Sequence, residues 1–155
     1  MKTGTFVREY PTTRILLADD DPDDCFFFQE ALQKIDFPIQ LKTVHDGDML
    51  LSYLNKVSPL PDILFLDLNM PKKNGFMCLQ EVRKNPDWST LFIVMYSTYL
   101  DNQLIETLAD SGANHFIQKP AKFDLLVKML ERTLEIVDEE RADPSKTSTF
   151  IIRSE

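Results

Sequence analysis

The sequence predicts an α/β fold, in which a five-stranded parallel sheet carries helices on both faces. Strand-length apolar runs alternate with helical patterns five times along the chain, which is typical of strands joined by helical crossovers. The run at residues 63–66, Ile-Leu-Phe-Leu, is apolar at every position, as in a strand buried on both faces of a parallel sheet. Charged or hydroxyl residues follow four of the five runs, and they indicate where a site lies.

The elements follow one another along 155 residues. A first strand is expected at residues 14–18. Asp21 caps the helix after it, at about residues 22–35, because its carboxylate accepts from free backbone N–H groups and Pro22 suits the first turn. Asp23 and Asp24 suit the positive end of that helix. The other predicted strands are 39–44, 63–66, 91–96 and 113–118. The other predicted helices are 46–55, 75–84, 100–110 and a last one from 123 to 137 or somewhat beyond.

The composition argues against several functional classes. With 17 basic and 25 acidic residues, the chain has a formal net charge of −8, which disfavours non-specific binding to nucleic acids or anionic membranes. No apolar run approaches the roughly 20 residues of a membrane span, and the first residues lack the pattern of a signal peptide. Cys25 and Cys78 lack the spacing of a metal site, so we expect free thiols in a cytoplasmic protein.

The chain is expected to form one domain at residues 14–138, after an extension at 1–13 and before a flexible tail at 139–155. The tail is charged, then rich in Ser and Thr, and it carries a short apolar triplet at 150–152 that is able to dock on another surface. No output domain such as a helix-turn-helix fits into the residues after 137. We therefore expect a stand-alone, single-domain protein.

Residues suited to chemistry cluster at the predicted carboxyl ends of the strands, where ligands bind in open α/β sheets. Asp19 and Asp20 follow the first strand, Asp67 the third, Ser97 the fourth and Lys119 the fifth. Each of these alone has a simpler explanation as a helix cap, a solvated turn or an exposed side chain. Their joint occurrence, in order and at strand ends, predicts one site.

Three clustered carboxylates predict a bound cation, because they repel one another unless positive charge lies among them. Mg²⁺ (or Mn²⁺) suits such a site, with two carboxylates, the backbone carbonyl of Asn69 and waters as ligands. A carboxylate held beside the cation and Lys119 is able to attack phosphorus and form an aspartyl phosphate. Lys119 and the Ser97 hydroxyl then meet the charge on the transferring phosphoryl oxygens.

The sequence resembles the receiver domain of two-component response regulators and is similar to CheY-like proteins. The motifs that carry the resemblance, over about residues 14–137, are Ile15-Leu-Leu-Ala-Asp-Asp20, Leu64-Phe-Leu-Asp-Leu-Asn-Met-Pro71 with Gly75, Tyr96-Ser-Thr98, and Gly112-Ala113 through Lys119-Pro120. The resemblance implies a flavodoxin-like sheet with strand order 2-1-3-4-5. It also implies phosphoryl transfer from a sensor histidine kinase or a phosphotransfer protein, and a phosphorylation-dependent change in binding to an unknown downstream protein.

By its motifs, the resemblance assigns the cation and phosphoryl-acceptor roles. Asp67 is the expected phosphoacceptor. The expected ligands of the cation are Asp20, Asp67 and the Asn69 backbone carbonyl, with Asp19 acting partly through water. Asn69 also stands at a position that governs water access to the aspartyl phosphate, and so the rate of dephosphorylation.

The resemblance further assigns a phosphoryl-binding and switch group: Lys119, Ser97, Thr98 and Phe116. Ser97 is the hydroxyl that turns toward the phosphoryl group, and Phe116 stands where the family often has a switching Tyr. Phe116 is able to change rotamer but lacks the Tyr hydroxyl. Tyr99 stands at a second position that governs water access, and its bulk is expected to slow hydrolysis of the phosphate.

The last predicted helix carries a second apolar stripe, formed by Leu125, Met129 and Ile136, beside the stripe that packs on the sheet. A broad amphipathic helix explains both stripes. Alternatively, the second stripe is a dimer or output surface, so both a monomer and a homodimer through this helix stay open.

Three other functions compete with that of a signalling phosphoacceptor. A phosphorelay intermediate or phosphate sink shares every motif and stays open. An aspartate-nucleophile phosphohydrolase needs a second acid two residues after its nucleophile, where Asn69 stands. A flavin-binding protein needs a phosphate-binding loop after the first strand, where three aspartates stand. We therefore expect no enzyme beyond self-catalysed phosphoryl acceptance and slow autodephosphorylation.

Overall fold

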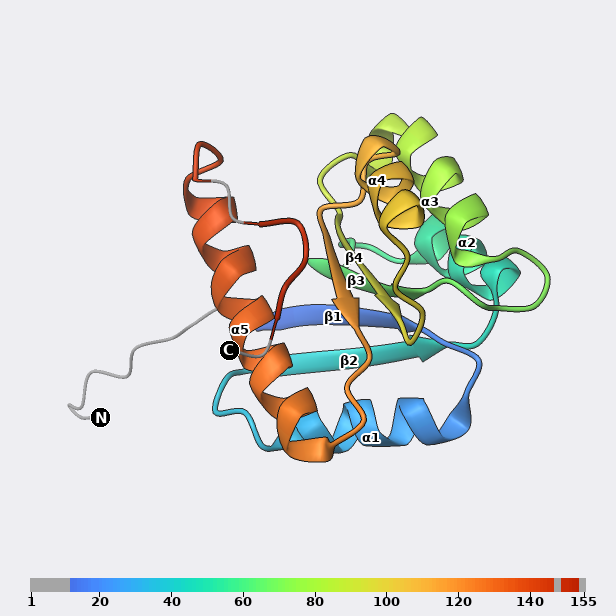
Figure 1. The fold of residues 1–155 in the computed structure, drawn as a ribbon. Helices are drawn as coiled ribbons and strands as arrows, with labels where there is room; N and C mark the ends of the chain where they lie inside the picture. Colours follow the sequence, from blue (N-terminus) through green and yellow to red (C-terminus); the bar gives the residue numbers. More distant parts are fainter. Residues whose placement is uncertain (1–11, 147–148, 154–155) are drawn as a thin grey trace.

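The computed structural model describes residues 12–146 and 149–153. It confirms the predicted fold: five parallel strands form one sheet in the order β2-β1-β3-β4-β5 (Figure 1). The strands are β1 (Thr13–Ala18), β2 (Ile39–Val44), β3 (Ile63–Asp67), β4 (Phe92–Ser97) and β5 (His115–Gln118). The helices are α1 (Pro22–Gln33), α2 (Gly47–Lys56), α3 (Gly75–Lys84), α4 (Asn102–Asp110) and α5 (Phe123–Ala142), with a short 3-10 helix at Pro86–Trp88.

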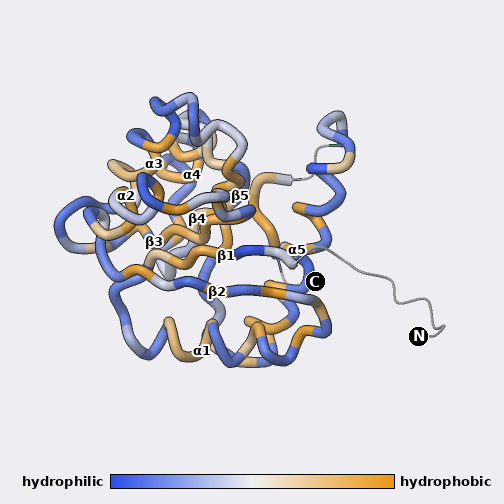
Figure 2. Tube along the Cα trace, turned by 180° about the vertical axis from the view of Figure 1, so that it is seen from behind, coloured by the Kyte–Doolittle hydropathy of each residue, from blue (hydrophilic) through white to orange (hydrophobic). Residues whose placement is uncertain are grey.

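The sheet is buried on both faces, and this explains its apolar strands. Helices α1 and α5 cover one face, and α2, α3 and α4 cover the other (Figure 1). Alternate residues of β1 point to the two layers, with Ile15 and Leu17 in the α1–α5 core and Leu16 and Ala18 in the other. Each fully buried aliphatic side chain contributes about 2 kcal/mol. In Figure 2 the central strands are largely hydrophobic, whereas each helix alternates between hydrophobic and hydrophilic residues, as expected for helices with one buried side.

Local signals in the sequence set the ends of the helices. The Asp21 carboxylate accepts from the N–H groups of Asp23 and Asp24, as predicted for the α1 cap. Side chains cap α2, α3 and α4 in the same way, through Asp46, Asn74 and Asp101 respectively. Because these caps and the apolar runs are local features, the predicted bounds of most elements lie within two residues of the observed ones.

Helix α5 differs from its prediction in the face it buries. It continues to Ala142, five residues beyond Val137, in line with the expectation that it runs somewhat past that residue. The prediction that Met129 belongs to a possible interface is wrong, because this side chain is only 6% exposed and packs in the α1–α5 core. The apolar pattern did not place Met129 on the buried face because Thr133, one turn later on that face, is polar. The Thr133 hydroxyl is buried and donates to the Met129 carbonyl at 2.7 Å. Leu125 is exposed and Ile136 is partly buried, so the three residues do not form one exposed stripe.

The described part of the tail also differs from the expected flexible segment. Residues 149–153 run beside β5, the edge strand that the sheet leaves open (Figure 1). The Phe116 N–H donates to the Phe150 carbonyl at 3.0 Å, and the Ile152 N–H donates to the Phe116 carbonyl at 2.9 Å. Ile152 is buried against the α1–α5 core, while Phe150 and Ile151 pack on the other core. The apolar triplet therefore docks on its own domain.

We predict that Ile152→Asp lowers the free energy of unfolding by about 2 kcal/mol, because it places a charge in a buried apolar site. Urea unfolding followed by circular dichroism measures the change. Arg153→Ala is the control, since it alters the net charge by the same amount at an exposed neighbour. Equal stability of the two variants would show that the tail contributes nothing to the folded domain.

Candidate functional site

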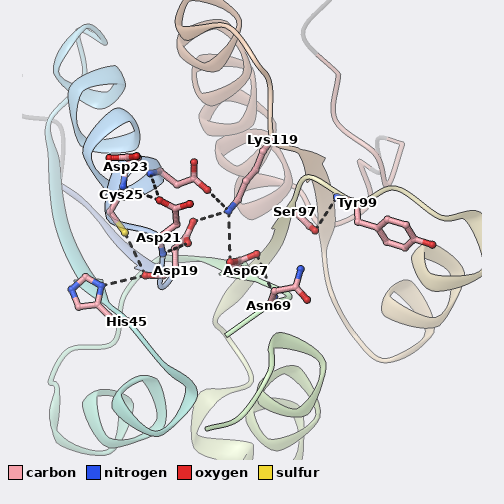
Figure 3. A network of polar contacts seen from close by, with 11 residues as sticks. Asp19, Asp21, Asp23, Cys25, His45, Asp67, Asn69, Ser97, Tyr99 and Lys119 are labelled. Carbon is pink, nitrogen blue, oxygen red and sulfur yellow. Dashed lines mark hydrogen bonds and ion pairs between the residues drawn. The ribbon is translucent and has the colours of Figure 1, made fainter. Parts of the chain in front are cut away.

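The predicted acidic residues meet at the carboxyl edge of the sheet. Asp19 and Asp20 follow β1, and Asp67 is the last residue of the neighbouring strand β3. One carboxylate oxygen from each of the three lies within 4.8 Å of the others. Asp19 and Asp67 are buried, whereas Asp20 is exposed. Figure 3 shows Asp19 and Asp67 converging on Lys119, which follows β5.

The Lys119 ammonium is the positive centre of this cluster. Its Nζ lies 2.9 Å from Asp19 Oδ2, 2.8 Å from Asp24 Oδ2 and 3.6 Å from Asp67 Oδ2. Burial lowers the pKa of Lys119, but hydrogen bonds to Asp19 and Asp24 outweigh burial, so its pKa lies above the ordinary value. Lys119 is therefore charged at neutral pH.

Asp24 is the site residue that the sequence did not reveal. The sequence predicts that Asp24 serves the helix start, and the acidic first turn of α1 does contain it. Its carboxylate also reaches across to Lys119, 95 residues later in the chain. One sequence feature does point to Asp24 as a site residue, namely its position in the first turn after β1. That turn lies at the same edge of the sheet as the strand ends.

Tyr96 lies beneath the Lys119 ammonium, 5.0 Å from Nζ to the ring centroid. The ring is buried and makes edge-to-face contacts with Phe28 and Phe65, at centroid distances of 5.6 and 6.3 Å. A cation over an aromatic face is stabilised by about 1 kcal/mol or more when water is excluded. The bulky residue before Ser97 thus supports Lys119 from the core side.

Asp67 carries the clearest electrostatic perturbation among the carboxylates. Burial raises its pKa to about 7, the Lys119 charge opposes this, and the negative Asp19 adds to it. The Asn69 N–H donates to Asp67 Oδ1 at 3.4 Å. Asp67 is a buried carboxyl group with a raised pKa, and it lies beside two more carboxylates. Such a site is suited to bind a metal cation in addition to the Lys119 ammonium. The oxygen-only donor set fits Mg²⁺ or Mn²⁺.

The loop after β3 requires glycine at one position. Gly75 begins α3 against the end of β3, and its N–H donates to the Leu68 carbonyl at 2.9 Å. A Cβ on Gly75 would lie 2.2 Å from the Asp67 carbonyl oxygen, which is too close for any side chain. The glycine that follows the Asp67 motif therefore lets the α3 helix approach the backbone of the site.

The backbone of Asp19 is held by two neighbouring side chains. The Cys25 thiol donates to the Asp19 carbonyl at 3.4 Å, and His45 Nδ1 lies 3.2 Å from the same oxygen. Burial, with the nearby Asp19 charge, raises the pKa of Cys25 to about 12. Cys25 is therefore a structural thiol rather than a nucleophile, and both cysteines are free, as expected.

The hydroxyl predicted to act as a switch lies at the end of β4. Ser97 is fully buried, and its Oγ accepts from the Tyr99 N–H at 3.2 Å (Figure 3). Its carbonyl accepts from the Lys119 N–H at 2.8 Å, which ties β4 to the Lys119 loop. Thr98 is exposed, and its carbonyl accepts from the Gln118 side chain. The switch roles of Ser97 and Thr98 stay predictions.

The aromatic expected to move, Phe116, is fully buried in the core beneath α2, α3 and α4. The structure thus shows one of its two expected positions. The backbone of Phe116 is the part of β5 that bonds to the tail. Its movement on phosphorylation stays a prediction.

A family model described as the response regulator receiver domain matches residues 15–131, three quarters of the chain. The chain belongs to this family. Among curated relatives, it is 29% identical over 126 residues to the response regulator Rcp1 of Synechocystis sp., covering 78% of this chain and 86% of that protein. It is also 26% identical over 152 residues to the 3',5'-cyclic-nucleotide phosphodiesterase regA of Dictyostelium discoideum, where it covers 96% of this chain but spans only 19% of the relative.

Solved structures support this assignment. The phosphorylated cyanobacterial phytochrome response regulator RcpA matches with a TM-score of 0.73 and 27% identity. The match covers 90% of this chain and all of the RcpA chain. The Mn²⁺-bound form of Rcp1 matches with a TM-score of 0.69 and 26% identity, covering 89% and 98% of the two chains. Receiver domains interact with histidine kinases or phosphotransfer proteins and bind a divalent metal. Within residues 12–146 and 149–153, no helix is long and apolar enough to cross a membrane.

Proposed function

We propose that this receiver domain accepts a phosphoryl group on Asp67 from a sensor histidine kinase or a phosphotransfer protein, and signals by changing which protein it binds. The observation that carries the proposal is the convergence of three carboxylates within 4.8 Å of one another, with the Lys119 ammonium 3.6 Å from Asp67. Family membership and the phosphorylated and Mn²⁺-bound relatives support the same chemistry.

The chain's own residues supply most of the chemistry. Asp67 ends the buried strand β3 and is itself buried, with its carboxylate close to those of Asp19 and Asp20. One carboxylate oxygen attacks phosphorus, the bond from phosphorus to the donor breaks, and the donor leaves with that electron pair. Lys119 donates to the transferred phosphoryl oxygens, and the Ser97 hydroxyl turns from the Tyr99 N–H toward the same oxygens.

Asp19, Asp20, Asp67 and the Asn69 carbonyl would hold Mg²⁺ or Mn²⁺. When bound, the cation supplies positive charge for the carboxylates and the phosphoryl oxygens. We place this activity in the cytoplasm, where free thiols such as Cys25 and Cys78 persist. Beyond acceptance and slow loss of phosphate, we propose no enzymatic turnover.

The proposal is tested by incubating the protein with acetyl phosphate and Mg²⁺, then measuring its intact mass. The expected result is one phosphoryl adduct, absent when EDTA replaces Mg²⁺ and absent from Asp67→Asn. Asp23→Asn, at an exposed acid in the first turn of α1, is the control and is expected to keep the adduct. No adduct from any small phosphodonor, or an adduct that persists in Asp67→Asn, contradicts the proposal.

Tyr99 is proposed to slow the hydrolysis of the aspartyl phosphate. Its N–H donates to the Ser97 hydroxyl, so its backbone adjoins the site, while its side chain is 60% exposed and points away from Asp67 in Figure 3. We expect Tyr99→Ala to lose phosphate several-fold faster, because water then reaches phosphorus more easily. The decay of the phosphoryl adduct, followed by mass after removal of acetyl phosphate, measures this rate. An unchanged rate would contradict the role of Tyr99 in excluding water.

A further inference from the structure

The Lys119 ammonium already makes two hydrogen bonds in the unphosphorylated protein. It donates to Asp19 at 2.9 Å and to Asp24 at 2.8 Å, whereas Asp67 lies 3.6 Å away, beyond a hydrogen bond. An ammonium has three N–H donors, so two of the three point toward the β1 and α1 side of the pocket. The third donor is uncommitted, so Lys119 serves more than one phosphoryl oxygen on Asp67 only if it withdraws a donor from Asp19 or Asp24.

The two partners of Lys119 differ in what else they do. Asp19 is fully buried and belongs to the three carboxylates of the cation site. Asp24 lies outside that group, in the first turn of α1, with 34% of its side chain exposed. Asp21 already caps α1, so the Asp24 carboxylate is not needed for that role.

We infer that Asp24 is a positioning residue that holds Lys119 in a resting orientation and competes with the phosphoryl group for its donors. This inference rests on the proposed function. In the resting protein, Asp24 keeps the ammonium on the α1 side. On phosphorylation, the phosphoryl oxygens compete with Asp24 for the donors of Lys119, so the strength of the Asp24 ion pair affects how readily the phosphorylated arrangement forms.

The competition has a definite direction. Removing the Asp24 charge frees a Lys119 donor and so strengthens binding of a phosphoryl group. A merely structural role for Asp24 predicts the opposite, because a loosened α1 would weaken the pocket. A partly exposed ion pair of this kind changes the affinity by about 5-fold.

The test measures the affinity for beryllofluoride, a stable mimic of the phosphoryl group, by ¹⁹F NMR at saturating Mg²⁺. Asp24→Asn is expected to bind beryllofluoride about 5-fold more tightly than the wild type. Asp24→Glu, which keeps the carboxylate, is expected to return the affinity to within about twofold of the wild type. Asp23→Asn is the matched control. It removes the same charge from the neighbouring residue, whose side chain is exposed and is not among the ion-pair partners of Lys119.

The outcomes separate this inference from the proposed function. If Asp24→Asn binds no more tightly than Asp23→Asn, or binds more weakly, the competition is overturned while phosphoryl acceptance stands. If Asp24→Glu behaves like Asp24→Asn, the carboxylate is not what holds Lys119, and the inference is again overturned. If the wild type binds no beryllofluoride in an Asp67-dependent way, the proposed function fails and the inference fails with it.

Discussion

Asp67→Asn is expected to abolish phosphoryl acceptance and, in cation-free buffer at pH 8, to stabilise the fold. The Asp67 carboxylate is 5% exposed, and burial raises its pKa from 3.8 to about 7. A carboxyl group with a raised pKa contributes stability that is complete below the unfolded value and is lost as the pH rises through the folded value. At pH 8 the wild type therefore holds an ionised carboxylate in a site that disfavours it.

The Asn side chain is neutral at every pH. The stability of Asp67→Asn relative to the wild type therefore grows as the pH rises and Asp67 of the wild type ionises. We expect Asp67→Asn to raise the free energy of unfolding by about 2 kcal/mol more at pH 8 than at pH 5. Urea unfolding in EDTA at both pH values measures the difference. Asp138→Asn, at an exposed acid of α5, is expected to change stability little at either pH. A variant less stable than wild type at pH 8 would show that the three carboxylates do not strain the fold.

Lys119→Met is expected to have the opposite effect on stability, in addition to loss of phosphoryl acceptance. The ammonium is the cation shared by Asp19, Asp24 and Asp67, and its side chain is 9% exposed. Removing one partner of a buried ion pair leaves the other partner unpaired at a cost of roughly 3–5 kcal/mol. We expect a loss of about 3 kcal/mol at pH 8, measured by urea unfolding in EDTA.

Two controls define the origin of that loss. Lys122→Met removes an equal charge from an exposed side chain at the start of α5 and is expected to have little effect. Adding Asp67→Asn to Lys119→Met is expected to recover part of the lost stability, because neighbouring sites in one network are not additive. If Lys119→Met is as stable as Lys122→Met, the ammonium does not neutralise the pocket.

The fold and most of the site follow from local features of the sequence. Continuous apolar runs, such as β3, mark strands with two covered faces, and Asp21 marks the start of α1. Topology then brings the strand ends together, so Asp19, Asp67 and Lys119 were predictable as one group before their distances were known.

The remaining features depend on tertiary contacts that no local pattern encodes. The Asp24 carboxylate meets a lysine 95 residues away, which first-turn chemistry alone does not indicate. Residues 149–153 form backbone hydrogen bonds with the open edge strand β5. Their apolar triplet is too short for the alternating pattern that predicts a strand. Met129 was placed on the wrong face because a buried threonine interrupts the apolar stripe of α5.

The most direct test of the account is to locate the phosphoryl group chemically. The protein is phosphorylated with acetyl phosphate and Mg²⁺, and borohydride then reduces the acyl phosphate to a primary alcohol with release of phosphate. Peptide mass spectrometry reads the product. The account predicts homoserine at position 67 and unchanged aspartates at positions 19, 20 and 24. Homoserine at any of those three positions, with Asp67 intact, would contradict it.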